Sequence, residues 1–305
     1  MNRSAPRSID QYLRELKSAL GDADPALIQD ALYDAEEYLR AEVASHPDKS
    51  EADVLEIIGS TYGAPDEVAS AYRTTEAQVS AALSPPKPAR PESRIGRFFA
   101  IYSDSRAWTS LFYMLLTLAT GIVYFTLVVT GFALSAGFAV LIIGIPFFLL
   151  FIGLTRILSL AEGRLVEGLL GVRMPRRGHY PMRGVSLFKR IQAMLTDRRT
   201  WTTILYLVLM LPLGIVYFTV AVAGAALSLG CIASPLAEIL HSLGLTSAAF
   251  QIDDHPVGAA AGIPASLIIG ALGVVLLTAY FHVIRALGNL HGQLAKALLV
   301  ARDGL

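Results

Sequence analysis

Few residues of this 305-residue chain have the types and spacing that chemistry needs. The six histidines, at positions 46, 179, 241, 255, 282 and 291, are scattered, and no two have metal-ligand spacing on one helix. The sequence contains no P-loop, Gly-rich dinucleotide loop, HExxH motif or CxxC motif. The single cysteine, Cys231, is best explained as a small apolar residue near a membrane boundary. We therefore predict no catalytic residue, no metal site and no cofactor.

One polar cluster, expected outside the membrane, is a candidate ligand site. It consists of Asp253, Asp254 and His255, which precede Pro256. Carboxylates of this kind could bind a cation or a cationic peptide. The alternative interpretation is an exposed turn, because three adjacent residues cannot all face one ion. The sequence leaves both interpretations open and favours the turn.

A second acidic group is a candidate surface for a partner. Asp30, Asp34 and Glu37 share one face of a predicted helix, opposite its apolar residues. The simpler interpretation is a solvated helix surface. The alternative is docking to a basic partner, which is either a separate protein or the basic stretch of this same chain at Arg173–Arg199.

The zero net charge hides an uneven distribution of charges. The chain has 25 Lys and Arg against 25 Asp and Glu, but residues 1–80 hold 7 basic and 16 acidic residues, a net charge of −9. The remainder therefore carries +9. Only 16% of the residues are charged, against about 25% in soluble proteins. With 54% hydrophobic residues and a mean hydropathy of +0.52, a soluble enzyme, a disordered chain and a disulfide-rich secreted chain are all disfavoured.

Four segments are long and apolar enough to cross a bilayer. No charged residue occurs between Arg106 and Arg156, which leaves room for two spans in 109–155 with a turn near Ser135–Gly137. A third span is predicted in 202–230 and a fourth in 263–283. Because these spans carry no charged residue, the sequence argues against proton- or ion-coupled transport but not against the handling of a lipid or an apolar substrate.

The distribution of Lys and Arg predicts the orientation in the membrane. The connection at 156–200 holds 10 basic residues, whereas the loop between the third and fourth spans, at about 231–262, holds none. Residues 1–11 have no apolar signal-peptide region. We therefore expect a multi-pass protein of the bacterial cytoplasmic (inner) membrane, with both termini in the cytoplasm.

The membrane half contains an internal repeat. Residues 104–135 and 197–228 align without gaps at an offset of 93, with 18 of 32 positions identical. The helices that follow align at an offset of 129, so that Arg156 corresponds to Arg285 and Leu158 to Leu287. Each unit is thus predicted to be a two-span hairpin with an amphipathic tail, and the two units are parallel. The tails either lie on the membrane or pack beneath the bundle.

Two kinds of residue in the repeat have predicted structural roles. Trp108 and Trp201 occupy equivalent positions beside the cytoplasmic face, where an indole anchors a span. Small residues at four-residue spacing favour close helix packing, with a ligand cleft as the alternative. These packing residues are Gly131 and Ser135 in the first unit and Gly224 and Ser228 in the second.

The sequence predicts an all-α protein with four parts. Residues 1–80 form an acidic cytoplasmic domain of about four short helices, with Ser8, Asp24 and Ser50 as helix N-caps. Residues 81–106 form a Pro-rich linker and a basic juxtamembrane stretch. Residues 107–196 form the first membrane repeat, and residues 197–305 form the second, with an outer-loop insertion at about 231–262.

Several of these motifs resemble known bacterial domains. The pattern of Tyr12-Leu13 and Leu16, Ile57-Ile58-Gly59 and Gly63-Ala-Pro65-Asp-Glu-Val-Ala69 resembles the HAAS-type helical signalling domain. Trp108 and Trp201 with the two Gly-Ile-Val-Tyr-Phe segments and Ile143-Gly-Ile-Pro146 resemble the "putative sensor" transmembrane domain. The resemblance implies signal transduction, with a PadR-like transcription regulator as a partner. Some relatives carry a fused histidine kinase, which this sequence does not supply, so output is expected through contact with another protein.

Two classes of function remain open at this stage. The favoured hypothesis is a non-enzymatic membrane sensor or regulatory protein that passes an envelope signal to a cytoplasmic partner. The alternative is a transporter or a transport-accessory membrane subunit. The expected partners are the lipid bilayer, a cytoplasmic regulator and, as an open alternative, further copies of the chain. Direct contact with nucleic acid is not expected.

Overall fold

The computed structural model describes residues 6–83, 93–139, 144–176, 192, 195–245, 251–252, 255–256 and 262–300. Almost all of these residues are helical, in agreement with the predicted all-α class. The strands in the described part of the chain form a minimal antiparallel hairpin in which β1 (Gln251–Ile252) pairs with β2 (His255–Pro256).

The N-terminal domain is a small bundle of four helices with its own core. Three of them begin at the predicted caps, because Ser8, Asp24 and Ser50 accept hydrogen bonds from the backbone amides of Gln11, Ala26 and Asp53. The apolar stripe of α1 is fully buried, and it packs mainly on α2 and α4. The helices are α1 (Ile9–Leu20), α2 (Pro25–Ser45), α3 (Glu51–Thr61) and α4 (Pro65–Leu83).

The described residues that follow this domain are mostly in long apolar helices. Four of them are long and apolar enough to span a bilayer, as the sequence predicts. Short helices precede the first one and follow the second. In order these elements are α5 (Arg94–Phe99), η1 (Ala100–Ser103), α6 (Ser105–Ala139), α7 (Gly144–Leu165), the π-helical turn η2 (Val166–Leu170), α9 (Arg198–Ser242) and α10 (Gly262–Leu299).

Helix ends differ from the sequence-based expectations in two places. α6 runs through the predicted turn at Ser135–Gly137 and ends at Ala139, and α9 continues past Gly230 to Ser242. Residues 231–242 therefore belong to a helix rather than to an outer loop. The continuation of α9 is packed against α10, because a Cβ on Gly273 would lie 2.7 Å from the backbone nitrogen of Ile232. Such close packing supports a helix that propensity alone does not specify.

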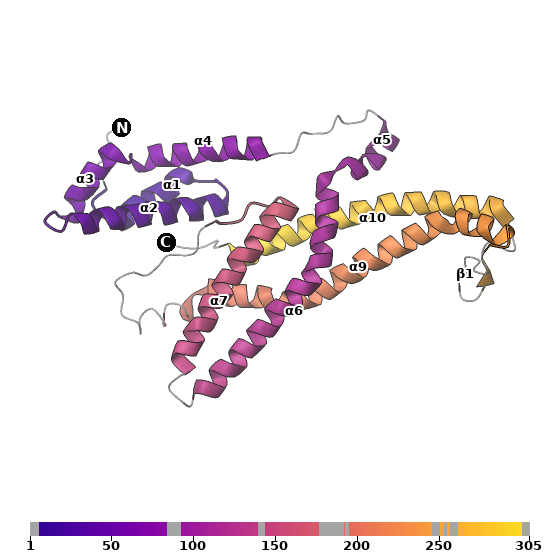
Figure 1. Cartoon of the computed structure of the whole chain (residues 1–305). Helices are drawn as coiled ribbons and strands as arrows, with labels where there is room; N and C mark the ends of the chain where they lie inside the picture. Colours follow the sequence, from indigo (N-terminus) through magenta and orange to yellow (C-terminus); the bar gives the residue numbers. More distant parts are fainter. Residues whose placement is uncertain are drawn as a thin grey trace.

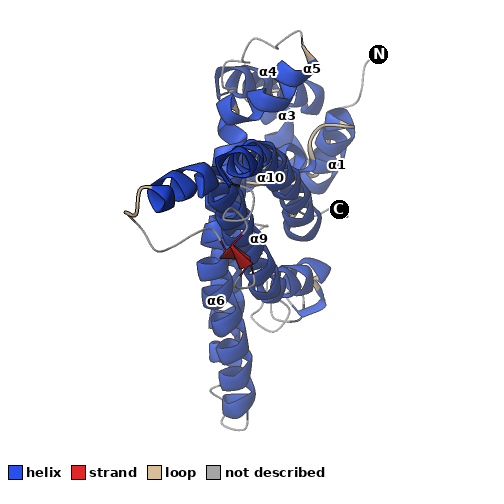
Figure 2. Cartoon of the chain, turned by 90° about the vertical axis from the view of Figure 1, so that its right-hand side faces the viewer, coloured by secondary structure: helices blue, strands red, loops and turns tan. Residues whose placement is uncertain are grey.

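The four long helices form two hairpins that cross each other. α6 pairs with α7 and α9 pairs with α10, and the broadest contact between the hairpins joins α6 to α9. The hairpins diverge from this crossing, so that their tips lie far apart (Figure 1). The N-terminal domain lies beside the ends of α7 and α10, opposite the tip of the α6–α7 hairpin (Figures 1 and 2).

Two equivalent glycines form the crossing itself. A Cβ on Gly121 of α6 would lie 2.6 Å from the carbonyl oxygen of Met210, and one on Gly214 of α9 would lie 2.6 Å from that of Thr117. Only glycine allows two helix backbones to approach this closely. Gly121 and Gly214 occupy the same position in the two sequence repeats, so the contact is reciprocal.

Candidate functional site

A buried glutamate lies inside the helical bundle, near the end of α7. Glu162 of α7 has no exposed surface, although it falls within the second candidate span. Its Oε1 accepts hydrogen bonds from the hydroxyls of Tyr113 (2.5 Å) and Tyr206 (3.1 Å), and its Oε2 accepts one from Tyr124 (2.9 Å). This corrects the expectation that the spans carry no charged residue. An ionisable group inside a span is a candidate functional group by default.

A histidine completes the cluster from the other hairpin. His291 of α10 is also fully buried. Its Nε2 lies 2.6 Å from the hydroxyl of Tyr113 and 3.0 Å from that of Tyr206, and its Nδ1 lies 3.3 Å from the hydroxyl of Tyr217. Glu162 and His291 therefore share two tyrosine hydroxyls, and each has one further tyrosine of its own.

The members of this cluster occupy equivalent positions in the two repeats. Tyr113 and Tyr206 are 93 positions apart, as are Tyr124 and Tyr217, and Glu162 and His291 are separated by 129. Both offsets are those of the sequence alignment. The sequence does not reveal the cluster by itself, because Glu162 lies beyond the spans predicted in 109–155 and His291 is one of six scattered histidines. The signal that could reveal it is the alignment at the offset of 129, which pairs Glu162 with His291.

Equivalent residues also form ion pairs at the start of the two hairpins. Asp104, before α6, accepts a hydrogen bond from the Arg106 amide and pairs with Arg285 of α10 at 2.7 Å. Asp197, before α9, caps Arg199 in the same way and lies 4.0 Å from Arg156 of α7. Each aspartate thus caps its own helix and contacts the second helix of the other hairpin.

The small residues chosen for packing lie within the hairpins. A Cβ on Gly131 would overlap the ring of Phe151, and one on Gly224 would lie 2.5 Å from the ring of Tyr280. Both glycines thus accommodate an aromatic ring from the partner helix of their own hairpin. Ser135 and Ser228 are buried.

The two tryptophans and the amphipathic tails have matching surroundings in the two units. Trp108 and Trp201 are each about half exposed, and their indole N–H groups donate to the carbonyls of Tyr102 and Leu195. Apolar residues of the tails pack into the main core of the bundle. The tails are therefore part of the bundle rather than separate helices on a membrane surface.

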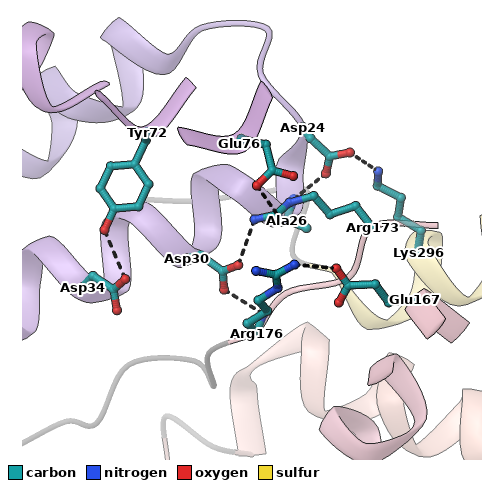
Figure 3. Close-up of polar contacts among 10 residues, drawn as sticks. All are labelled: Asp24, Ala26, Asp30, Asp34, Tyr72, Glu76, Glu167, Arg173, Arg176 and Lys296. Carbon is teal, nitrogen blue, oxygen red and sulfur yellow. Dashed lines mark hydrogen bonds and ion pairs between the residues drawn. The ribbon is translucent and has the colours of Figure 1, made fainter. Parts of the chain in front are cut away.

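The N-terminal domain is attached to the bundle by one central arginine. Arg173 follows η2 by three residues, and its guanidinium contacts Asp30 of α2 at 3.2 Å and Glu76 of α4 at 2.9 Å (Figure 3). The side chains of Arg173 and Asp30 are 14% and 9% exposed, so solvent screens this ion pair only partly. One cation thus joins two helices of the domain to the end of α7.

Two further contacts surround this arginine. Lys296 of α10 pairs with Asp24, the N-cap of α2, at 2.5 Å, and the backbone amide of Arg176 donates to Asp30 at 2.8 Å. The side chain of Arg176 binds Glu167, and that hydrogen bond raises the pKa of the guanidinium. Asp30, Arg173 and Arg176 border a cleft of about 370 Å³ between the domain and the bundle, which is also lined by Tyr72, Thr75, Val79 and Arg164.

The three acidic residues proposed for partner binding have different surroundings. Asp30 is only 6% exposed and faces Arg173, so the interpretation as a solvated surface is wrong for this residue. Asp34 is half-buried and accepts a hydrogen bond from Tyr72. Burial, followed by the charge of Asp34, raises the pKa of the Tyr72 hydroxyl, which therefore stays a donor. Glu37 is exposed. Their role in binding a partner stays a prediction.

The proposed outer-loop site is largely outside the described residues. Asp253 and Asp254 are not among them, and His255 is described only as a part of strand β2. Across the part of the chain that the structure describes, no group of three or more His, Cys, Asp or Glu residues is arranged to hold a metal ion. The outer-loop site therefore stays a prediction.

Comparison with known proteins identifies the family of the membrane half. The family model described as "Putative sensor" matches residues 113–299, which is more than half of the chain and includes every member of the buried cluster. No curated protein and no solved structure matches the chain. The match contains no part of the N-terminal domain, so the HAAS-type resemblance stays a prediction. Because the match covers both hairpins, the chain belongs to the "Putative sensor" family.

Proposed function

We propose that this chain is a non-enzymatic membrane sensor that transmits an envelope signal to a cytoplasmic regulator by docking and releasing its N-terminal domain. The family and the four apolar helices suggest a membrane sensor, and the family suggests a role other than catalysis. The signal, the regulator, the inner-membrane location and the cytoplasmic position of both termini are parts of the proposal.

The contact of Arg173 with Asp30 and Glu76 is the observation that carries this proposal. The backbone between the span and this arginine is short, because η2 ends at Leu170 and only Gly171, with a φ of 69° in the left-handed region, and Val172 precede Arg173. A displacement of the end of α7 would therefore move Arg173 directly. Lys296 gives α10 a second contact with the domain. Rearrangement of the hairpins would thus act on the domain through both helices.

Release of the domain would uncover an acidic surface. Asp24, Asp30 and Glu76 would lose the cations that contact them from the bundle, and Glu37 of α2 is already exposed. An acidic surface of this kind fits a basic surface on a partner. The HAAS-type resemblance favours a PadR-like transcription regulator as that partner.

The test compares two charge reversals in the full-length chain, in membranes of the native host. A photo-crosslinking amino acid replaces the exposed Glu37, and Arg173→Glu is compared with Arg14→Glu, an exposed residue of α1. We expect Arg173→Glu to increase the capture of one cytoplasmic regulator and to change the expression of its target genes. Arg14→Glu should behave as the wild type. Equal capture in all three proteins would contradict the proposal.

The second candidate function is transport, and Glu162 is the observation that favours it. Buried ionisable residues in spans mark ion pathways in many transporters. Purification from native membranes separates the two functions. Recovery of a stable transport ATPase, or ion flux in proteoliposomes, would favour transport, whereas recovery of a transcription regulator would favour the sensor.

A further inference from the structure

The cluster of Glu162, His291 and four tyrosines places polar side chains where the packing of the helices needs only apolar ones. Six buried polar side chains from four helices meet there, and the two ionisable members, Glu162 and His291, have no exposed surface. A buried carboxylate without full compensation is costly in an apolar bundle. Apolar side chains of similar volume would fill the same space without this cost.

Within the cluster, the two repeats differ at one pair of equivalent positions, Glu162 and His291. The tyrosines of the cluster are the same in both units, but the first unit has a glutamate where the second has a histidine. The symmetric tyrosine framework therefore encloses an acid and a base. The hydroxyls of Tyr113 and Tyr206 lie within hydrogen-bond distance of both. This geometry connects Glu162 to His291 through a single hydroxyl on either side.

From this arrangement we propose that Glu162 and His291 form a proton-binding site of the membrane domain. In the form with one proton fewer, Glu162 is ionised and accepts three tyrosine hydrogen bonds, while a neutral His291 accepts one at Nδ1 and donates from Nε2. Uptake of one proton, on Glu162 or on His291, makes the cluster neutral. The hydroxyls rotate to suit either location.

The groups that face this site come from all four long helices. α7 supplies Glu162 and α10 supplies His291, and the remaining members are tyrosines. α6 contributes Tyr113 and Tyr124, and α9 contributes Tyr206 and Tyr217. Since the neutral cluster is the form that an apolar bundle accommodates best, proton uptake stabilises the closed crossing. Proton loss leaves a net negative charge among the helices and favours their separation.

The site is also close in sequence to both contacts that hold the N-terminal domain. Glu162 precedes η2 by four residues, and Arg173 follows η2 by three. His291 precedes Lys296 by five residues on the same helix. If the docking that the proposed function describes is correct, proton loss releases the domain. This consequence rests on the proposed function, whereas the proton-binding site does not.

Infrared difference spectroscopy tests the site on the full chain in lipid nanodiscs. Spectra at acidic and alkaline pH are compared for the wild type, Glu162→Gln and Glu238→Gln. Glu238 is the control because it is a second buried carboxylate, on α9. We expect a carboxyl or imidazolium difference band that disappears in Glu162→Gln and persists in Glu238→Gln. A wild type without such a band, or a band unchanged in Glu162→Gln, would overturn the site.

If Glu162→Gln does not fold, the loss of its band is uninformative, so a second variant exchanges the two ionisable residues. Glu162→His combined with His291→Glu restores an acid–base pair within the same tyrosine framework, because the two positions are equivalent. We expect this variant to fold and to recover the difference band. A folded exchange variant without the band would also overturn the site.

Docking is measured separately, as the yield of a cysteine crosslink between Thr75→Cys and Arg164→Cys. We expect the yield to fall as the pH rises in the wild-type background and to stay high in the neutral variant Glu162→Gln. If the difference band is present but the yield is independent of pH, the proton-binding site stands and its coupling to docking is refuted. If the yield depends on pH equally in Glu162→Gln, another group is responsible and the proposed coupling is likewise refuted.

Discussion

Alanine at Gly121 tests whether the two hairpins cross as closely as the structure indicates. The new Cβ would lie 2.6 Å from the carbonyl oxygen of Met210 and 3.0 Å from the Cα of Leu211, both of them backbone atoms. Ordinary contacts begin at 3.4 Å. Because a backbone carbonyl cannot rotate away as a side chain can, α6 and α9 must move apart. Overpacking of this kind costs about 1–3 kcal/mol.

The matched control is Gly137→Ala on the same helix, where a Cβ meets nothing within 4 Å. Alanine favours a helix over glycine by about 1 kcal/mol, so the control should be stabilised. Unfolding in mixed micelles with increasing denaturing detergent, followed by tryptophan fluorescence, measures the difference. We expect Gly121→Ala to be less stable than Gly137→Ala by about 1–3 kcal/mol. Equal stabilisation of the two variants would refute the close crossing.

Three further substitutions test separate parts of the fold. Leu16→Ala removes a fully buried side chain of α1 and should lower the free energy of unfolding by about 2–5 kcal/mol, as measured by chemical or thermal denaturation. Burial raises the pKa of Glu36, so wild-type stability should fall as the pH rises through that pKa, and Glu36→Gln should remove this dependence in a denaturation series against pH. Tyr280→Phe loses the hydrogen bond to the carbonyl of Ala221 and should cost about 0.5–1.5 kcal/mol in detergent unfolding.

Helix caps and spans were predictable because they depend on neighbouring residues. The caps at Ser8, Asp24 and Ser50 each satisfy an amide two or three positions away. The spans follow from an unbroken apolar length. Local rules failed at the end of α9, where the sequence predicted an outer-loop insertion from about residue 231. There α10 stabilises the helix, since a Cβ on Gly270 would lie 2.8 Å from Pro235.

The candidate sites depend on contacts between distant residues. Arg173 and Asp30 are 143 positions apart, and the sequence indicates docking to the basic stretch only as one of two alternatives. Tyr113 and His291 are 178 positions apart, and their proximity follows from how the hairpins cross. The sequence repeat contained part of this information, because both offsets pair the members of the cluster. It did not show that the paired positions meet in space.

The position of the N-terminal domain on the bundle is the central claim, and a cysteine crosslink tests it most directly. Thr75 of α4 and Arg164 of α7 are exposed and line the same cleft, so Thr75→Cys with Arg164→Cys in a Cys231→Ala background should react with a short bifunctional reagent in native membranes. Glu56→Cys, on the exposed surface of α3, replaces Thr75→Cys in the control. We predict efficient intramolecular crosslinking of the first pair and little of the control pair. Equal yields, or no product from the first pair under any condition of pH or envelope stress, would contradict the account.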